Sequence, residues 1–462
     1  MTAQTILPAN TLSSGYDVDN SLRFSKASST GLELDLGTPT NAKKYTISFW
    51  IKREVNGSGG DIIAGGTNGS NETFIRMNAN GLFQFKADHG SATSWAVNPN
   101  ALGRDPSAWY HYVAAVDTTQ GTASNRVKIY LNGVLQSLGT ANYPDEDHAS
   151  DFLNNDNVIH IGKRNYDSSV HFGGYLCEFV FLDGQTLDST SFGEFDENSP
   201  TIWKPKDVSG LTFGDNGFYL EFKQSGTSQN SSGLGADTSG NDNHFAVENL
   251  TAVNQSTDTC TNNFATLNPL IYESRDNTFA DGNLKITGGT ADGWANKYGV
   301  SSMAVSSGKW FVEAKATTMV TSQGVLGIMG TSTALAGSMR DTGPANIDSG
   351  GRISGGGGDH QTGLTSFSNG DIAGAAFDAD NGTIQFYRNG STYGNAVSSI
   401  ASDTYYFVTN SYEQNAVVEF NFGSPPYSES GGNSDADGHG NFSMAVPNGY
   451  FALNTKNLAE YG

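Results

Sequence analysis

The chain has 462 residues, which is more than one hydrophobic core normally serves, so its length predicts roughly two or three domains. A total of 25 Lys and Arg against 47 Asp and Glu gives a net charge of -22, which repels phosphate backbones and anionic lipid and argues against nucleic acid as a partner. Charged residues make up only 16%, with 57 Gly, 26 Phe and 19 Tyr, and this profile is typical of many short strands joined by tight turns. The composition predicts an all-β fold with two domains.

The number of cysteines and the first residues of the chain indicate the cellular compartment in which the protein is made. Only Cys177 and Cys260 are present, too few for a secreted chain of this length that depends on disulfides, so we expect none. Cys177 shares a strand face with apolar residues and is expected to lie in the core. Residues 1–12 lack a basic start followed by an apolar stretch, and no window approaches the roughly 18 apolar residues of a membrane span. We therefore expect synthesis in a reducing cytoplasm and no membrane insertion.

Strand patterning begins near residue 20 and continues to about residue 225. Asn132-Gly133 has the residues that a two-residue hairpin turn requires and is the strongest local signal in the chain. His111 and His160 stand inside apolar strands and are expected to be interior residues rather than metal ligands. The predicted strands of this region cover residues 45–52, 61–64, 73–77, 81–86, 109–116, 126–131, 158–162 and 174–182.

The order of these segments resembles a laminin-G-like or concanavalin A-like jelly roll over roughly residues 20–200. The resemblance is carried by the order and spacing of the segments 21–24, 45–53, 109–117, 127–135, 159–164 and 173–188. It implies a two-sheet antiparallel sandwich that usually binds sugar or protein.

From about residue 225 to 289 the composition shifts toward Ser, Thr, Asn and Asp, and such a stretch cannot bury much apolar surface. We place a domain boundary here. The segment 243–250 is strand-like, so the connector is expected to pair in part with a sandwich. The segment 258–270 resembles a connector of tail and fibre proteins of marine phages.

A second set of strands follows, with another Asn-Gly turn at Asn389-Gly390. Its order over about residues 290–425 resembles a SPRY domain, a family that implies a concanavalin-like sandwich, recognition of proteins through loops at one end, and no catalysis. The Gly- and Ser-rich stretch 330–370 is predicted to be a loop or an insertion, without an aromatic residue before Phe367. The predicted strands cover residues 309–315, 324–329, 371–378, 383–388, 405–408 and 417–423.

The predicted organisation is an N-terminal arm (1–20), a laminin-G-like jelly roll (21–225), a polar connector (226–288) and a SPRY-like sandwich with a C-terminal tail (289–462). The opening 15–24 and the ending 447–458 also resemble phage tail proteins. These resemblances imply a bacteriophage virion surface protein, made in the host cytoplasm, that adheres to host-surface glycan or protein or decorates the particle. The arm would contact other virion proteins, and fibre proteins of this kind imply a homotrimer.

Ligand binding would require an aromatic face for the sugar ring and fixed polar groups for its hydroxyls. Trp95 and Tyr143 are the candidate aromatic residues, with Asp145 and Asp147 as polar partners; the alternative is that Trp95 packs against a sheet and the acids are only solvated. The same acidic loop, with Glu146 between the two aspartates, could supply oxygen ligands to Ca²⁺.

Catalysis is the main alternative function. Glu33 and Asp35 share a strand face and residues 194–197 contain three acids, but neither arrangement places two carboxylates facing a cleft as a retaining glycosidase requires. No nucleophile elbow, phosphate loop or paired metal-ligand motif is present. We expect no enzyme activity, with two alternatives left open: a glycan depolymerase of a phage tail, and a cellular adapter that uses its SPRY module.

Overall fold

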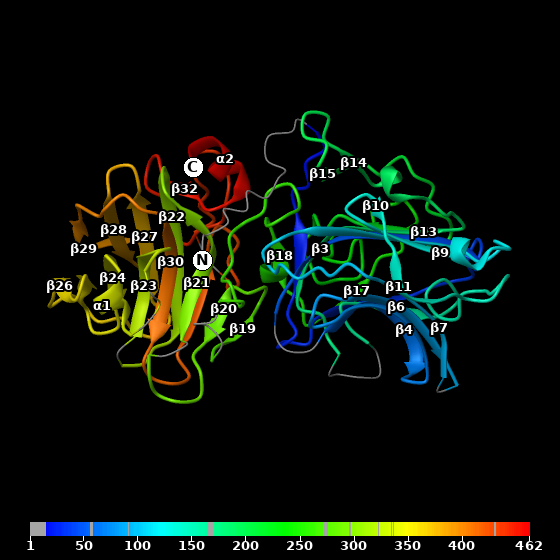
Figure 1. Cartoon of the computed structure of the whole chain (residues 1–462), viewed down its shortest axis with the longest axis horizontal. Helices are drawn as coiled ribbons and strands as arrows, with labels where there is room; N and C mark the ends of the chain where they lie inside the picture. Colours follow the sequence, from blue (N-terminus) through cyan, green and yellow to red (C-terminus); the bar gives the residue numbers. More distant parts are fainter. Residues whose placement is uncertain are drawn as a thin grey trace. The chain divides into compact units, whose positions relative to one another are not determined.

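A computed structural model describes residues 15–55, 59–90, 92–164, 170–271, 276–294, 297–321, 323–333, 335, 337–428 and 431–462. Strands account for 43% of the chain and helices for 5%, which confirms the all-β prediction. Within the described residues the chain forms two compact units (Figure 1): the first unit ends at Thr261 and the second begins at Asn262. Most of the predicted arm, residues 1–14, lies outside the described residues.

The first unit is a sandwich of two sheets. In one of them, sheet A, all neighbouring strands are antiparallel. At the hairpin between β9 and β10, Asn132 and Gly133 have φ of 46° and 83°, so the predicted turn is confirmed. In spatial order sheet A contains β10 (Val134–Leu135), β9 (Val127–Leu131), β8 (Tyr110–Asp117), β3 (Lys44–Arg53), β13 (Gly174–Asp183), β1 (Ser21–Phe24) and β18 (Gln255–Ser256), with β16 (Phe218–Leu220) on β13.

The facing sheet, sheet B, is also antiparallel throughout. In spatial order it contains β11 (Leu138–Asn142), β7 (Ala92–Pro99), β6 (Phe83–His89), β5 (Asn71–Met77), β4 (Gly60–Asn68), β12 (Val158–Ile161), β2 (Gly31–Asp35) and β17 (Ala246–Glu248). The remaining elements of the unit are the pair β14 (Gly193–Phe195) and β15 (Trp203–Pro205) and the 3-10 turns η1 (Ala123–Asn125), η2 (Ser189–Ser191) and η3 (Ala252–Asn254).

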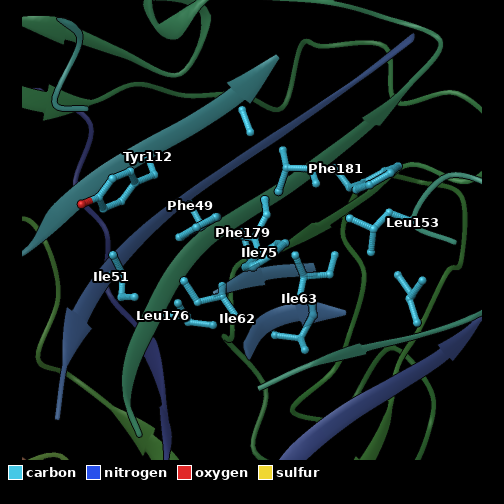
Figure 2. Close-up of a cluster of buried hydrophobic side chains, with 14 of the residues drawn as sticks. Phe49, Ile51, Ile62, Ile63, Ile75, Tyr112, Leu153, Leu176, Phe179 and Phe181 are labelled. Atoms are coloured by element: carbon cyan, nitrogen blue, oxygen red, sulfur yellow. The ribbon is translucent and has the colours of Figure 1, made fainter. Parts of the chain in front are cut away.

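The core of the first unit lies between sheets A and B, because alternate residues of each strand point inward. Figure 2 shows Phe49 and Phe179 from sheet A close to Ile63 and Ile75 from sheet B. All four side chains are fully buried. Cys177 is buried too, on the opposite face of β13, so the prediction that it is buried is confirmed; it and Cys260 belong to one apolar cluster and are not joined in a disulfide.

Part of the predicted connector belongs to the first unit. β17 pairs with β2 and β18 pairs with β1, as expected for a connector that adds strands to a sandwich. Beyond β18, the side chain of Asp258 reaches Lys52 on the outer face of sheet A, with 2.7 Å between carboxylate and ammonium. The unit boundary after Thr261 therefore lies inside the stretch 226–288, because strand pairing and this ion pair hold its first half.

The second unit is another antiparallel sandwich, with a core between sheets C and D. Sheet C contains β19 (Thr278–Ala280), β20 (Lys285–Thr287), β31 (Val417–Asn421), β22 (Lys309–Thr318), β27 (Ile372–Asp378), β28 (Thr383–Arg388) and β29 (Ser391–Val397), with the short β32 (Phe451–Ala452) parallel to β22. Sheet D contains β21 (Tyr298–Val305), β30 (Tyr405–Ser411), β23 (Gln323–Gly330), β24 (Ala345–Asp348), β25 (Ile353–Gly355) and β26 (Gly358–Gln361). The helices are α1 (Met339–Thr342) and α2 (Thr455–Tyr461).

The stretch 330–370 is not a loop throughout, because β24, β25 and β26 within it extend sheet D by antiparallel pairing. Glycine suits this stretch because a two-residue turn, Gly356-Gly357, joins β25 to β26, and both glycines have positive φ. The low hydrophobicity of the stretch hid these strands from the sequence analysis.

Candidate functional site

The loop that carries the predicted acidic residues closes one end of the first sandwich. We call residues 143–151 the end loop. Backbone amides of Asp147 and Ser150 donate to the carbonyls of Thr118 and Ala42, each at 2.8 Å, and the Thr118 hydroxyl donates to the His148 carbonyl at 2.6 Å. These hydrogen bonds fix the end loop to the ends of sheet A.

Beneath the end loop lies a small cavity of about 10 Å³, partly open to solvent; we call it the end pocket. Sheets A and B form its walls and the end loop forms its roof. Its lining residues are Tyr45, Thr73, Trp95, Val116, Thr118, Pro144, His148, Ser150 and Asp151.

Strand register explains why there is space at this place. Thr73 of β5 lies opposite Ala87 of β6, which in turn lies opposite Trp95 of β7, so the three residues form one inward-facing row across sheet B. From sheet A, the paired residues Tyr45 and Val116 line the other side. The two outer residues of this row, Thr73 and Trp95, line the end pocket, and the alanine between them has the smallest side chain of the three.

Three residues that line the end pocket carry a buried polar atom without a hydrogen-bond partner: Trp95 at its indole Nε1, Thr73 at its hydroxyl Oγ1 and His148 at Nε2. The side chains of Trp95 and Thr73 are 3% and 1% exposed. A buried donor without a partner costs about 1–3 kcal/mol, and most buried polar groups in proteins are paired. A ligand atom or a water that accepts these bonds would offset this cost, so the unpaired atoms mark the end pocket as a candidate binding site.

An ionisable pair borders the pocket on its loop side. His148 Nε2 lies 3.2 Å from Asp151 Oδ2. The nearby Asp151 carboxylate raises the pKa of His148 above its usual value, against the opposing effect of burial. When His148 is protonated the pair is neutral overall, so it adds no net charge to the site.

The predicted ligand residues are not arranged as a surface against which a sugar ring could stack. Trp95 lies in β7 rather than in a loop, and its ring packs edge-on against Phe85 in the core with centroids 4.7 Å apart. The prediction that its face stacks on a sugar does not fit this burial, since the side chain is 3% exposed. Tyr143 is half-buried against the core, while Asp145 and Asp147 are exposed on the end loop.

The calcium hypothesis is not supported by the end loop. Glu146 accepts a hydrogen bond from Arg126 at 3.3 Å and Asp147 pairs with Lys43 at 2.9 Å, so their charges are compensated by cations. The described residues contain no group of three or more His, Cys, Asp or Glu side chains that could hold a metal ion. Asp145 alone cannot supply the six or more oxygens that Ca²⁺ takes.

Sequence reasoning missed Thr73, His148 and Asp151 as members of this site. Thr73 carried a signal, because it is a polar residue on the same strand face as Ile75 and Met77. Nothing local indicated that the end loop would lie over it, since that contact joins residues more than 70 positions apart.

A second group of buried polar residues, on the outer face of sheet A, is fully paired; we call it the outer cluster. Asp258 accepts hydrogen bonds from Lys52 at 2.7 Å and from the indole of Trp109 at 3.1 Å. Trp203 donates to His111 Nδ1 at 2.9 Å, so Nε2 of His111 carries the proton and donates to Ser48 Oγ at 2.9 Å.

Burial lowers the pKa of His111 to about 3, so this ring is neutral at physiological pH. His160 is also buried, and it bonds Glu33 at 3.0 Å. The prediction that both histidines are interior residues is confirmed. Neither one belongs to a group of three or more His, Cys, Asp or Glu side chains that could hold a metal ion among the described residues.

Comparison with known protein families agrees with both sandwiches. Residues 11–189 match a laminin G family of the concanavalin A-like lectin/glucanases superfamily, and residues 330–425 match the SPRY domain family. The chain therefore combines a laminin-G-like jelly roll with a SPRY domain. The end pocket and the outer cluster both belong to the laminin-G-like unit.

Solved structures with some similarity include the SPRY domain of human HERC1, at 21% identity and a TM-score of 0.26 over 30% of this chain and 87% of that one. Another is the LG4-5 pair of the mouse laminin alpha1 chain, at 13% identity and a TM-score of 0.30 over 91% of this chain and 93% of that one. We draw no inference from likenesses at these TM-scores. No curated protein is similar to this chain.

Proposed function

We propose that this chain is a non-catalytic binding protein of a bacteriophage virion surface, and that the laminin-G-like unit holds a hydroxyl-bearing ligand, such as host-surface glycan, at the end pocket. One observation carries the site: the unpaired Nε1 of Trp95 and Oγ1 of Thr73 border a cavity beneath the end loop. Lectin-like and SPRY folds are binding folds, which supports binding as the general activity.

The rim of the end pocket suits a sugar better than an apolar ligand. The carboxylate of Asp145 is exposed on the end loop beside Pro144, where it can accept hydrogen bonds from ligand hydroxyls. Tyr143 is half-exposed there and adds amphipathic surface. Such a combination of apolar surface and a small number of fixed polar groups is typical of small-ligand sites.

The virion assignment is supported by the resemblances of residues 15–24, 258–270 and 447–458 to phage tail proteins and by the net charge of -22, which keeps copies soluble. Under this proposal the N-terminal arm contacts other virion proteins and the protein acts as a homotrimer. The described residues contain no helix that is long and apolar enough to cross a membrane.

Filling the pocket tests the proposed binding site. On a glycan array followed by calorimetry with the full chain, we expect binding that is lost in Ala87→Leu, because the larger side chain stands between Thr73 and Trp95 in the same row and crowds the end pocket. Ala141→Leu, on the exposed edge strand β11, is the matched control and keeps binding. Thermal unfolding of each variant separates lost binding from lost folding. Unchanged affinity in folded Ala87→Leu contradicts the site.

The virion role has its own test. Mass spectrometry of purified phage particles should detect the chain in a stoichiometric amount, and its absence contradicts the assignment. Release of reducing sugar from host polysaccharide by the purified chain would contradict the non-catalytic part and favour the depolymerase alternative.

A second candidate function is that of a cellular adapter, which the SPRY match over residues 330–425 favours. SPRY loops would then bind a peptide, and the protein would be a soluble monomer outside any particle. Analytical ultracentrifugation together with the particle analysis distinguishes this function from the first.

A further inference from the structure

We infer that Lys52 and Asp258 of the outer cluster form an intramolecular amide bond, an isopeptide link between the lysine amine and the aspartate carboxyl group. This site is one of covalent modification, and it does not depend on the proposed ligand binding. The structure holds the two side chains as an ion pair, which is the reactant state for such a bond.

The reacting groups are already in direct contact. Nζ of Lys52 lies 2.7 Å from Oδ2 of Asp258, next to the carboxyl carbon that the amine would attack. Lys52 lies in β3, where it is paired with Tyr175 of β13, and Asp258 follows β18, which pairs with β1. Sheet A therefore fixes both sides of the contact, and holding two reactants in place gives a large gain in rate over a bimolecular encounter.

Burial favours the reactive form of the amine. The side chain of Lys52 is 0% exposed and that of Asp258 is 1% exposed. A lysine amine is a nucleophile only when it is neutral, and burial lowers the pKa of Lys52, against the opposing effect of the Asp258 carboxylate. Because the cost of removing two charges from water can exceed their attraction, transfer of a proton within the pair is favoured here more than at the surface.

Trp109 holds the second carboxyl oxygen. Its indole N–H donates to Oδ1 of Asp258 at 3.1 Å. Negative charge develops on this oxygen when the amine attacks the carboxyl carbon. A hydrogen-bond donor that is already in place stabilises that charge, as the donors of an oxyanion hole do.

The reaction needs no other reactant. One proton moves from Nζ to Oδ2, which gives a neutral amine and a carboxylic acid. The nitrogen lone pair then forms a bond to Cγ of Asp258, a second proton passes from Nζ to Oδ2, and the bond between Cγ and Oδ2 breaks to release water. Nζ keeps its third hydrogen as the amide N–H, and Oδ1 becomes the amide carbonyl oxygen.

Another lysine–aspartate pair of the same unit provides an internal control. Lys86 and Asp88 lie 2.8 Å apart, which is almost the same distance, but their side chains are 29% and 11% exposed. Water hydrates the charges of such a pair and keeps the amine protonated. We therefore expect no bond there.

The bond would join β3 to the end of the connector across 206 positions. Residues 255–261 could then not leave sheet A unless a covalent bond broke. A cross-link of this span also constrains the unfolded chain, so the linked form should unfold at a higher temperature than the unlinked form.

Mass spectrometry of the full chain tests the inference. After prolonged incubation of the folded chain, the intact mass should lie below the sequence mass by one water molecule. Tryptic mapping should yield a branched peptide that contains both Lys52 and Asp258, whereas the peptides around Lys86 and Asp88 stay linear. A chain kept in urea should retain the full mass, because only the fold brings the two residues together.

Two variants add separate readouts. Lys52→Arg keeps the positive charge but cannot form the amide, so it should retain the full mass. Trp109→Phe removes the donor to Oδ1 and should slow the loss of water roughly tenfold or more. Thermal unfolding shows whether each variant is folded, and the result for the parent chain does not depend on either of them.

The opposite results are equally clear. Recovery of Lys52 and Asp258 in separate linear peptides from the incubated folded chain overturns the inference. A loss of water located in a linear peptide, as in cyclisation of an aspartate to a succinimide, overturns it as well. An unchanged rate in folded Trp109→Phe contradicts the part assigned to the indole N–H.

Discussion

The laminin-G-like unit buries polar side chains in two places, and the two differ in how their hydrogen bonds are completed. In the outer cluster, Lys52, Asp258 and Trp109 satisfy one another, as do His111 and its partners. In the end pocket, Trp95 Nε1 and Thr73 Oγ1 have no partner. Burial alone therefore does not separate a structural polar group from a candidate ligand contact; the completeness of its hydrogen bonds does.

This difference has an energetic meaning. Removing one member of a complete cluster leaves its partner buried and unpaired, which is costly. Removing a group that has no partner relieves a cost instead. The following changes test this contrast, from the largest expected effect to the smallest.

Asp258→Ala should lower the free energy of unfolding by about 3–5 kcal/mol, because the ammonium of Lys52, which is 0% exposed, loses its counter-charge. Urea denaturation measures the loss. The double variant Lys52→Met with Asp258→Ala removes both charges and should regain much of the stability. If the double variant is no more stable than the single one, the ion pair is not what holds residues 255–261 to sheet A.

His111→Leu should lower the free energy of unfolding by about 2–4 kcal/mol, since Trp203 Nε1 and Ser48 Oγ lose their partner together. His111 stays neutral in the folded chain but takes up a proton near pH 6.5 in the unfolded chain, so the loss should be smaller at pH 6 than at pH 8, by about 1 kcal/mol. Chemical denaturation at both values checks this. A loss confined to the lower pH would indicate that the ring is charged in the folded state.

Glu178 should make stability depend on pH. Burial raises the pKa of its carboxyl from 4.5 to about 7, while Tyr219 donates a hydrogen bond to it at 2.5 Å. Because the folded pKa lies above the unfolded one, its contribution is complete below pH 4.5 and is lost as the pH rises through 7, by up to about 1.4 kcal/mol per pH unit.

Glu178→Gln provides the comparison for that pH effect. Thermal unfolding between pH 5 and 8 should show a shallower decline in the variant than in the parent chain, because glutamine does not titrate. Identical pH profiles would contradict the raised pKa of Glu178.

Two small hydroxyl deletions contrast the two regions most directly. Ser48→Ala removes a hydroxyl that bonds His111 and should cost about 1 kcal/mol. Thr73→Val removes a hydroxyl that is also buried but has no partner. In the absence of ligand it should leave the free energy of unfolding unchanged or raise it slightly. Equal costs in thermal unfolding would mean that the Thr73 hydroxyl has a bound partner, such as water.

Most strands could be predicted from the sequence, while the members of the site could not. The alternation in residues 45–52 and the turn Asn132-Gly133 predicted β3 and the β9–β10 hairpin because these signals are local. β7 was missed, since the small polar residues before Trp95 are typical of a loop. The acidic loop was correctly placed on the surface, but its carboxylates pair with Lys43 and Arg126 from other segments.

By itself, the sequence determined the all-β class, the order of the strands and the two Asn-Gly turns, because backbone preference and the two-residue alternation act between near neighbours. Only the tertiary structure decided that Asp258 meets Lys52 across 206 positions and that the end loop covers Thr73 and Trp95. Such meetings depend on strand register and sheet order, which arise from packing of the whole sandwich and leave no mark on any one segment.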